Sequence, residues 1–341
     1  MSFLRKTDNL ALSLQQVAGS GYFFQIDWPL QPYLWNLSYP SIRDNNRQRD
    51  DVMSTEFSIV TIVKRRTQQL SKLIGSIESS EQLPKEVVIV WMAPPSDESL
   101  LSSEHFPILH RFAASEAFPI AKARNRGFDT CKTDKIIYLD ADCICPDSLL
   151  GAMTSSLTAG KLVTANVHQL SQTVDSKSEN HLQQLVSLQQ STVEKIPFIE
   201  FDTTIFGITR EDYERVGGFD LDYCGYGLGD LDFAARCSQA GLYLLNTGRY
   251  VYKQFHAHYH PPVNHLCDIV TNAETFKQKW GTYPTSKVFA QFAELRLINS
   301  DYEQTGMRIT RLPDDDEMAE FFIEAPVEKS QRDAIALRQS A

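Results

Sequence analysis

The chain has 341 residues, of which 42% are hydrophobic and 11% aromatic, so it can form a packed core in one large domain or two ordinary ones. Its formal net charge of −10 argues against a surface for nucleic acid or anionic membranes, because either would need a basic patch to neutralise phosphates. We therefore expect small molecules or neutral polymers as its partners.

No window of the sequence approaches the roughly 18 consecutive apolar residues of a membrane span. The first ten residues include Asp8 and Asn9 and lack the pattern of a signal peptide. We therefore expect a cytoplasmic protein without a membrane span.

The six cysteines show no paired Cys-x-x-Cys zinc spacing, and a chain of this size needs no disulfide framework. We expect free thiols. A soft-metal site at Cys143 and Cys145 stays open as an alternative, although such a site needs two further ligands.

Residues 1–52 differ in composition from the rest of the chain. An aromatic and proline-rich stretch from 22 to 39 precedes a polar run from 43 to 51. Side chains such as Trp28 and Trp35 are too apolar to remain solvated, so we expect an N-terminal extension that packs on the main domain.

From Phe57 the hydrophobic pattern becomes regular and alternates between strand and helix periods. The elements predicted for the first half are a strand at 57–63, a helix through Leu70, Leu73, Ile74 and Ile77, a strand at 86–91, a helix at about 122–131 and a strand ending at Asp140. This order is typical of an α/β fold with a mostly parallel central sheet flanked by helices.

The second half is more mixed. Its predicted elements are a strand at 161–166, an amphipathic helix at 179–196, a strand at 203–208 and a helix at 210–216. We expect the main domain to span 53–296 and a tail without a readable motif to span 297–341.

Two carboxylates, Asp140 and Asp142, come directly after the apolar strand that begins at Lys135. Open α/β sheets place their ligands at the carboxyl ends of such strands. Carboxylates there suit Mg²⁺ or Mn²⁺, which takes its remaining ligands from water and substrate phosphates. A solvated acidic turn is the alternative for this pair alone.

A second motif combines glycines with an aromatic residue. Gly225, Gly227 and Gly229 form a flexible loop that can bring backbone and the Tyr226 ring close to a ligand, and Asp230 follows at the start of a helix. Helix capping would explain Asp230 alone, but it does not explain the loop before it.

Together these motifs resemble the GT-A-fold inverting glycosyltransferases of the family-two type, whose C-terminal half is similar to that of the β-1,4-galactosyltransferases. The resemblance covers roughly residues 57–284. It is carried by Lys64-Arg65-Arg66, by Ala121 to Gly127, by Asp140-Ala141-Asp142, and by Gly217, Gly218, Phe219, Gly225, Tyr226, Gly227, Asp230 and Asp232. Gly229 stands where that family has a glutamate.

The resemblance implies a role for each matching residue. Asp230 would be the catalytic base, and Asp140, Asp142 and His256 would hold Mn²⁺ or Mg²⁺. The nucleotide sugar would be bound by Lys64, Arg66, Arg124, Asn125, Asp140 and Tyr226. The alternatives are solvated surface charges at the basic positions and a surface histidine cluster formed by His256, His258 and His260.

The function implied is inverting transfer of a hexose from a UDP-sugar to a hydroxyl of a saccharide or other small acceptor. The alternative is a non-catalytic protein that binds nucleotide sugars or serves as a scaffold on the same fold. Gly229 and Lys253 favour the alternative, since relatives carry a polar side chain at the first position and a potential metal ligand at the second. We expect Asp268, Asn272 and Trp280 to serve packing.

Overall fold

The structure is a computed structural model. It describes residues 55–95, 100–113, 118–170 and 192–324. The predicted N-terminal extension and most of the predicted helix at 179–196 lie outside the described residues, as does the end of the chain from 325.

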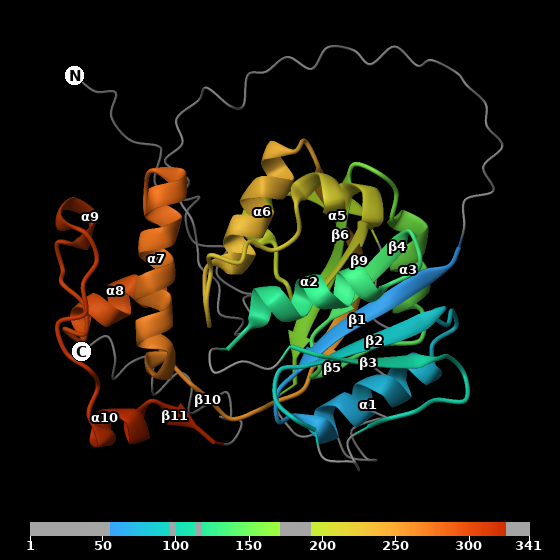
Figure 1. Ribbon diagram of the computed structural model, residues 1–341, viewed down its shortest axis with the longest axis horizontal. Coiled ribbons are helices and arrows are strands. Elements are labelled where there is room, and N and C mark those ends of the chain that lie inside the picture. The colour runs from blue at the N-terminus through green and yellow to red at the C-terminus, as the bar shows by residue number, and fades with distance from the viewer. Residues whose placement is uncertain (1–54, 96–99, 114–117, 171–191, 325–341) are drawn as a thin grey trace, which may run out of the picture.

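A central sheet runs through the larger part of the molecule (Figure 1). Its strands are β1 (Phe57–Val63), β2 (Glu86–Trp91), β3 (Ile108–Phe112), β4 (Lys135–Leu139), β5 (Cys143–Ile144), β6 (Lys161–Gln169), β7 (Glu194–Ile196), β8 (Ile205–Thr209) and β9 (Tyr243–Lys253). Their order is β3-β2-β1-β4-β8-β6-β9-β5, with β7 paired to β9. Strands β1 to β4, β6 and β9 run in one direction and β5, β7 and β8 in the other, which confirms the predicted mostly parallel sheet.

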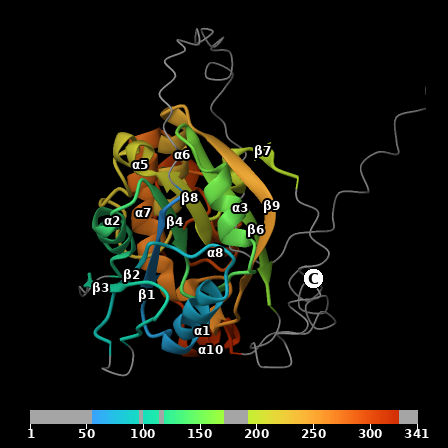
Figure 2. The same ribbon diagram turned by 90° about the vertical axis from the view of Figure 1, so that its right-hand side faces the viewer.

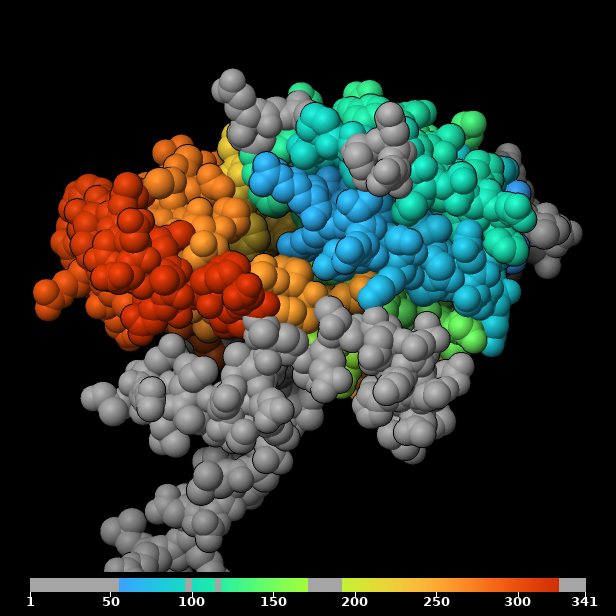
Figure 3. Space-filling model, turned by 90° about the horizontal axis from the view of Figure 1, so that it is seen from below, coloured from blue at the N-terminus to red at the C-terminus, as the bar shows by residue number. Residues whose placement is uncertain are grey.

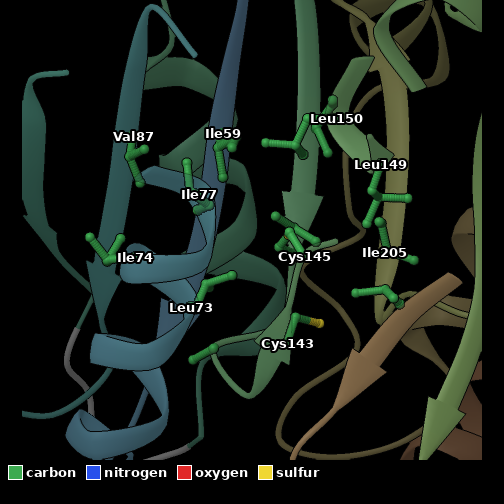
Figure 4. Close-up of a cluster of buried hydrophobic side chains, with 14 of the residues drawn as sticks. Ile59, Leu73, Ile74, Ile77, Val87, Cys143, Cys145, Leu149, Leu150 and Ile205 are labelled. Carbon is green, nitrogen blue, oxygen red and sulfur yellow. The ribbon is translucent and has the colours of Figure 1, made fainter. Parts of the chain in front are cut away.

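Helices cover both faces of this sheet. Because successive strand residues point to opposite faces, Ile59 and Val60 of β1 belong to different cores. On the first face lie α1 (Thr67–Glu78) and α3 (Leu149–Ser156), and on the second α2 (Ile120–Thr130), α5 (Arg210–Val216) and α6 (Gly229–Gln239) (Figure 2). Figure 4 shows Leu73, Ile74 and Ile77 of α1 on the first face.

A third core forms beside the sheet, away from its two faces (Figure 1). Its elements and their neighbours are β10 (His258–Tyr259), η3 (Val263–His265), α7 (Leu266–Trp280), α8 (Lys287–Glu294), α9 (Tyr302–Thr305), α10 (Asp315–Glu320) and β11 (Phe322–Ile323). Leu297, Ile298, Met307 and Phe321 are buried in it, so the described part of the expected tail is packed. Seen from below, the red C-terminal part and the blue N-terminal part lie on opposite sides with orange residues between them (Figure 3).

The structure confirms the strands predicted at 57–63 and 86–91 and the helix at 210–216. The predicted helix at 179–196 is wrong at its described end, because Glu194–Ile196 pairs with β9 and backbone hydrogen bonds to that strand replace helical ones. A short helix, η2 (Phe198–Glu200), comes next. Strand β3 is an element that the sequence pattern does not predict. No helix in the described ranges has both the length and the apolar character to cross a bilayer.

One edge of the sheet collects the residues that the sequence motifs single out. Strands β1, β4 and β9 run parallel, so their carboxyl ends, at Lys64, Asp140 and Lys253, lie at the same edge. Strand β8 runs antiparallel to β4, so its amino end, preceded by Thr203 and Thr204, reaches this edge as well. This edge is the candidate functional site.

Candidate active site

Asp142 lies fully buried at this edge, between a guanidinium and an imidazole. Arg66 Nη1 donates to Asp142 Oδ2 at 3.0 Å, and His256 Nε2 lies 3.3 Å from the same oxygen. Asp142 Oδ1 is buried and has no hydrogen-bond partner among the described residues. A buried carboxylate oxygen without a partner is costly, which marks this atom as one that a ligand can satisfy.

His256 is available as a neutral ligand. Burial and the nearby Arg66 guanidinium hold the pKa of His256 below its ordinary value, and they outweigh the opposing effect of Asp142. A neutral imidazole is the form that binds a metal ion. His258 holds His256 in place through a 2.9 Å hydrogen bond between its Nδ1 and the His256 carbonyl oxygen.

Asp140 faces a different set of partners. Lys253 Nζ lies 3.3 Å from Asp140 Oδ2, and the Tyr138 hydroxyl donates to Oδ1 at 2.9 Å. Lys253 also donates to Thr204 Oγ1 at 3.1 Å. Burial raises the pKa of Asp140, but Lys253 and Arg124 outweigh it and the net pKa lies below the ordinary value. Burial lowers the pKa of Lys253, but the carboxylates of Asp142 and Asp140 outweigh that effect and raise it. Lys253 therefore stays in the ammonium form.

These contacts separate the three predicted metal ligands. In the part of the chain that the structure describes, no three His, Cys, Asp or Glu side chains are grouped as a metal site. Asp142 and His256 come together, while Asp140 pairs with Lys253. A carboxylate with one unpartnered oxygen and a neutral imidazole still fit Mn²⁺ or Mg²⁺ that takes its other ligands from water and a diphosphate.

Asp230 lies in the first turn of α6 and is held by two side chains. Arg124 pairs with Asp230 Oδ1, and the Thr203 hydroxyl donates to Oδ2 at 2.7 Å. Arg124 also donates to Thr203 Oγ1 at 3.1 Å, which closes a three-residue network. The Asp230 side chain is 51% exposed, so it is both oriented and open to a ligand.

Arg124 lies between the two acidic parts of the site. Its side chain is 6% exposed, and its guanidinium carbon lies 4.9 Å from the ring centroids of both Tyr138 and Phe219. Burial lowers the pKa of Arg124, but Asp230 and, more weakly, Asp140 outweigh it and the net pKa is raised. The structure therefore brings Arg124 to Asp230, and its predicted contact with a nucleotide remains a prediction.

Helix α7 holds the glycine loop in place. Asn272 is fully buried and donates to the carbonyl oxygens of Cys224, Tyr226 and Gly227 at 2.8, 3.1 and 2.9 Å. Asp268 Oδ2 accepts a hydrogen bond from the Tyr226 amide at 3.1 Å. Asn272 and Asp268 therefore hold the backbone of the loop on both sides of the Tyr226 ring.

Tyr226 joins the two halves of the site. Its ring stacks on His265 at 4.4 Å, and burial raises the pKa of its hydroxyl to about 12, with Lys253, Asp230 and Asp140 among its charged neighbours. The charges of Asp140 and Asp230 therefore both act on the Tyr226 hydroxyl.

Two further predicted residues make contacts within the protein. The side chain of Asn125 binds the amide and carbonyl of Phe219, each at 2.8 Å, and so secures the turn at 218–219. Lys64 Nζ lies 4.5 Å from the centroid of the Phe118 ring. A role of either residue at a nucleotide stays a prediction.

Thr203 and Thr204 belong to the site although no sequence pattern singles them out, and His265 joins them from a stretch that the family resemblance covers without giving it a role at the site. The two threonines bind Asp230 and Lys253, and His265 stacks on Tyr226. Their spacing carries no motif, because their role arises from the antiparallel direction of β8 and from the position of α7. Only the structure could reveal the two threonines and the stacking of His265 on Tyr226.

Comparison with known proteins agrees with this geometry. Residues 107–257 match the family model described as Glycosyltransferase like family 2. This stretch of the chain is therefore similar to the glycosyltransferases of family 2. That range includes Arg124, the acid pair, Asp230 and His256. A search of curated proteins returned no match.

Solved structures of glycosyltransferases are similar at low identity. TarS of S. aureus in complex with UDP-GlcNAc is 10% identical with a TM-score of 0.49, covering 72% of this chain and 77% of that one. The mannosyltransferase PcManGT from Pyrobaculum calidifontis, in complex with GDP-Man and Mn²⁺, is 16% identical with a TM-score of 0.46, covering 71% and 70%. GalNAc-T7 with UDP, GalNAc and Mn²⁺ is 13% identical with a TM-score of 0.44, covering 59% of this chain and 43% of that one. These likenesses carry no argument about substrate.

Proposed function

We propose that this protein is an inverting, metal-dependent glycosyltransferase that moves a hexose from a UDP-sugar to a hydroxyl of a saccharide or other small acceptor. The observation that carries the proposal is the meeting of two chemically different parts at one sheet edge. One part is Asp142 with Arg66 and His256, and the other is Asp230 with Arg124. The match at 107–257 supports glycosyl transfer as the reaction.

The nucleotide-sugar donor is bound beside Asp142, Arg66 and His256. Asp142 and His256 would hold a divalent cation, which would act as a Lewis acid toward the leaving diphosphate. Arg66 and Lys64, which come after β1, add positive charge at the same edge. This charge stabilises the nucleoside diphosphate as it leaves with the electron pair of the broken sugar–oxygen bond.

The hydroxyl of the acceptor is activated beside Asp230 and Arg124. The acceptor oxygen bonds to the anomeric carbon from the face opposite the diphosphate, and its proton passes to the Asp230 carboxylate. Arg124 and Thr203 keep that carboxylate in one orientation. Attack from the opposite face inverts the anomeric configuration.

A non-catalytic role in binding nucleotide sugars is the second candidate. The ion pair between Lys253 and Asp140 favours it, because it occupies a carboxylate that the resemblance assigns to the metal and donor. Gly229, which provides no carboxylate beside Asp230, favours it as well.

Calorimetry and turnover test the proposal together. UDP or GDP should bind more tightly with Mn²⁺ than with a chelator, and Asp142→Ala should abolish the difference. A panel of nucleotide sugars with Mn²⁺, with and without saccharide acceptors, should give transfer for one donor. Equal nucleotide affinity with and without chelator would contradict the metal assignment, and binding without transfer to any acceptor would favour the non-catalytic candidate.

A further inference from the structure

We propose that Lys253 withholds Asp140 from the divalent cation, so that Asp142 and His256 alone supply the protein ligands and Lys253 sets the affinity for the metal. This inference rests on the proposed function, because it concerns how the same site holds its cation. Lys253 would act through Asp140, with which it forms an ion pair, and would not itself touch the substrate.

The first support is the difference between the two carboxylates. Both oxygens of Asp140 have donors, Lys253 Nζ at 3.3 Å and the Tyr138 hydroxyl at 2.9 Å. Asp142 has one oxygen that faces Arg66 and His256 and one without a partner in the described residues. Of the two carboxylates, only Asp142 has an oxygen without a hydrogen-bond donor among the described residues.

The second support is that Lys253 is fixed by the sheet. As the last residue of β9, it pairs with Cys143 on one side and with Gln169 on the other. Its carbonyl oxygen accepts the Leu170 amide at 2.9 Å, and its ammonium donates to Thr204 Oγ1 at 3.1 Å. The two strands therefore fix the backbone of Lys253, and the Thr204 hydroxyl holds its ammonium beside Asp140.

The third support is electrostatic. An ammonium beside Asp140 repels a dication that approaches the same carboxylate, and it satisfies the negative charge that would attract one. Removing the ammonium therefore releases Asp140 as an additional ligand and removes a repulsion. Both effects act in the same direction and raise affinity for the metal.

Binding of Mn²⁺ alone, followed by electron paramagnetic resonance or calorimetry without nucleotide, tests this inference. In Lys253→Met the dissociation constant for Mn²⁺ should fall by about tenfold or more. Lys253→Arg, which keeps the charge, should bind Mn²⁺ as the parent does. Lys135→Met is the matched control, because Lys135 lies at the opposite end of β4 and donates to the Thr154 carbonyl oxygen; its affinity for Mn²⁺ should be unchanged.

A double-mutant cycle shows whether the gain acts through Asp140. Asp140→Asn should weaken Mn²⁺ binding by the parent less than Asp142→Asn does, and it should reduce the gain in Lys253→Met to the part that comes from the lost repulsion. Thermal melting gives a second readout, because a ligand that binds the folded state raises the melting temperature. The rise on adding Mn²⁺ should be larger for Lys253→Met than for the parent.

Two results would overturn the inference while leaving the proposed function standing. One is unchanged Mn²⁺ affinity in Lys253→Met, and the other is a loss of affinity in Asp140→Asn as large as that in Asp142→Asn. Mn²⁺ binding by Lys253→Met but not by the parent would overturn the assignment of Asp142 and His256 as sufficient ligands and would remove metal dependence from the parent's proposed reaction. Absence of Mn²⁺ binding in every variant would overturn both the inference and the metal assignment, whereas glycosyl transfer would still be judged by turnover.

Discussion

Asp230 shows at the scale of a single residue how the site combines orientation with access. Its two oxygens are held by Arg124 and Thr203, yet half of the side chain is exposed. A general base needs both properties, since it must point at the acceptor proton and remain reachable. A substitution that removes only the ability of Asp230 to take a proton therefore separates its effect on turnover from its effect on donor binding.

In Asp230→Asn we expect turnover to fall by about 10² or more while donor affinity is retained, because the amide keeps the shape and cannot accept a proton. Turnover assays and calorimetry with the donor nucleotide measure the two effects. Unchanged turnover would mean that the base lies elsewhere.

Asp232 is the matched control for that substitution. It is fully buried and accepts hydrogen bonds from Arg236 Nε at 2.8 Å and Trp280 Nε1 at 3.0 Å, with Lys279 Nζ also 2.8 Å away. Asp232→Asn should therefore lower the melting temperature and have a smaller effect on turnover of the folded protein. The reverse pattern would identify Asp232 as the base.

Gly229 has backbone angles that a side chain can adopt, unlike its neighbouring glycines, but a Cβ there would be crowded by Tyr223. The φ angle of Gly229 is not positive. A Cβ added there would lie 3.3 Å from Tyr223 Cβ. Gly225 has a φ of +70° and a Cβ would lie 2.3 Å from Asp268, so that position requires glycine. Position 229 can therefore test whether a carboxylate beside Asp230 changes the reaction.

We expect Gly229→Glu to melt closer to the parent than Gly227→Glu does, with a small loss from crowding against Tyr223, and to change sugar preference or raise activity in a panel of donors and acceptors. Gly227→Glu is the control, because its φ of 93° is unfavourable for a side chain and should cost about 1 kcal/mol or more of stability. Equal melting of the two variants would contradict the backbone argument. An unchanged donor and acceptor profile in a folded Gly229→Glu would show that this position does not set specificity.

At the scale of the elements, α7 acts as the support of the glycine loop. Asn272 alone donates to three loop carbonyls and accepts a hydrogen bond from the Cys224 amide at 3.1 Å. The loop ends where α6 and Asp230 begin, so a change on α7 can reach the site without touching a substrate.

Asn272→Ala should destabilise the protein by about 2 kcal/mol or more, because it removes a buried side chain and leaves partly buried loop carbonyls without their donor. Turnover of the folded protein should fall too, since Tyr226 and Asp230 lose their support. Asn299→Ala is the control: Asn299 donates to Gly306 and accepts from the Arg308 amide, within the C-terminal segment. We expect it to lower the melting temperature without changing turnover, and equal effects of both variants on turnover would contradict a positioning role for Asn272.

At the scale of the whole molecule, the third core joins the C-terminal segment to the site. Phe322 pairs with Tyr259, and the His260 amide donates to the Phe321 carbonyl oxygen at 2.9 Å. This attaches the chain near 321 to the segment that carries His256. The same core includes Tyr223 and Leu228 of the glycine loop.

A chain ending at residue 296 should lose much of its stability. It would lack four apolar side chains of the third core, Leu297, Ile298, Met307 and Phe321. Each contributes about 1.5–3 kcal/mol when fully buried, and together they approach the roughly 5–15 kcal/mol that keeps a domain folded. Soluble yield and thermal melting measure the loss. A chain ending at 324 keeps every described contact and serves as the control, and equal melting of both chains would contradict the packing argument.

Local patterns predict much of the sheet and of its helices. Strands β1, β2 and β4 are apolar runs, and α1 repeats apolar residues at helical spacing, so short-range periodicity is enough. Strand β3 is partly exposed and β7 has only three residues, and both exist because a neighbouring strand offers hydrogen bonds. No local pattern could predict such elements.

The sequence by itself determined the α/β class, the acid pair at a strand end and the position of Asp230 at the start of a helix, because these depend on residues close together in the chain. Only the tertiary structure decided which charges meet. It paired Asp142 with His256, Asp140 with Lys253 and Asp230 with Arg124, across separations of more than 100 residues. Strand order and direction decide such contacts, and they are set by the packing of the whole sheet.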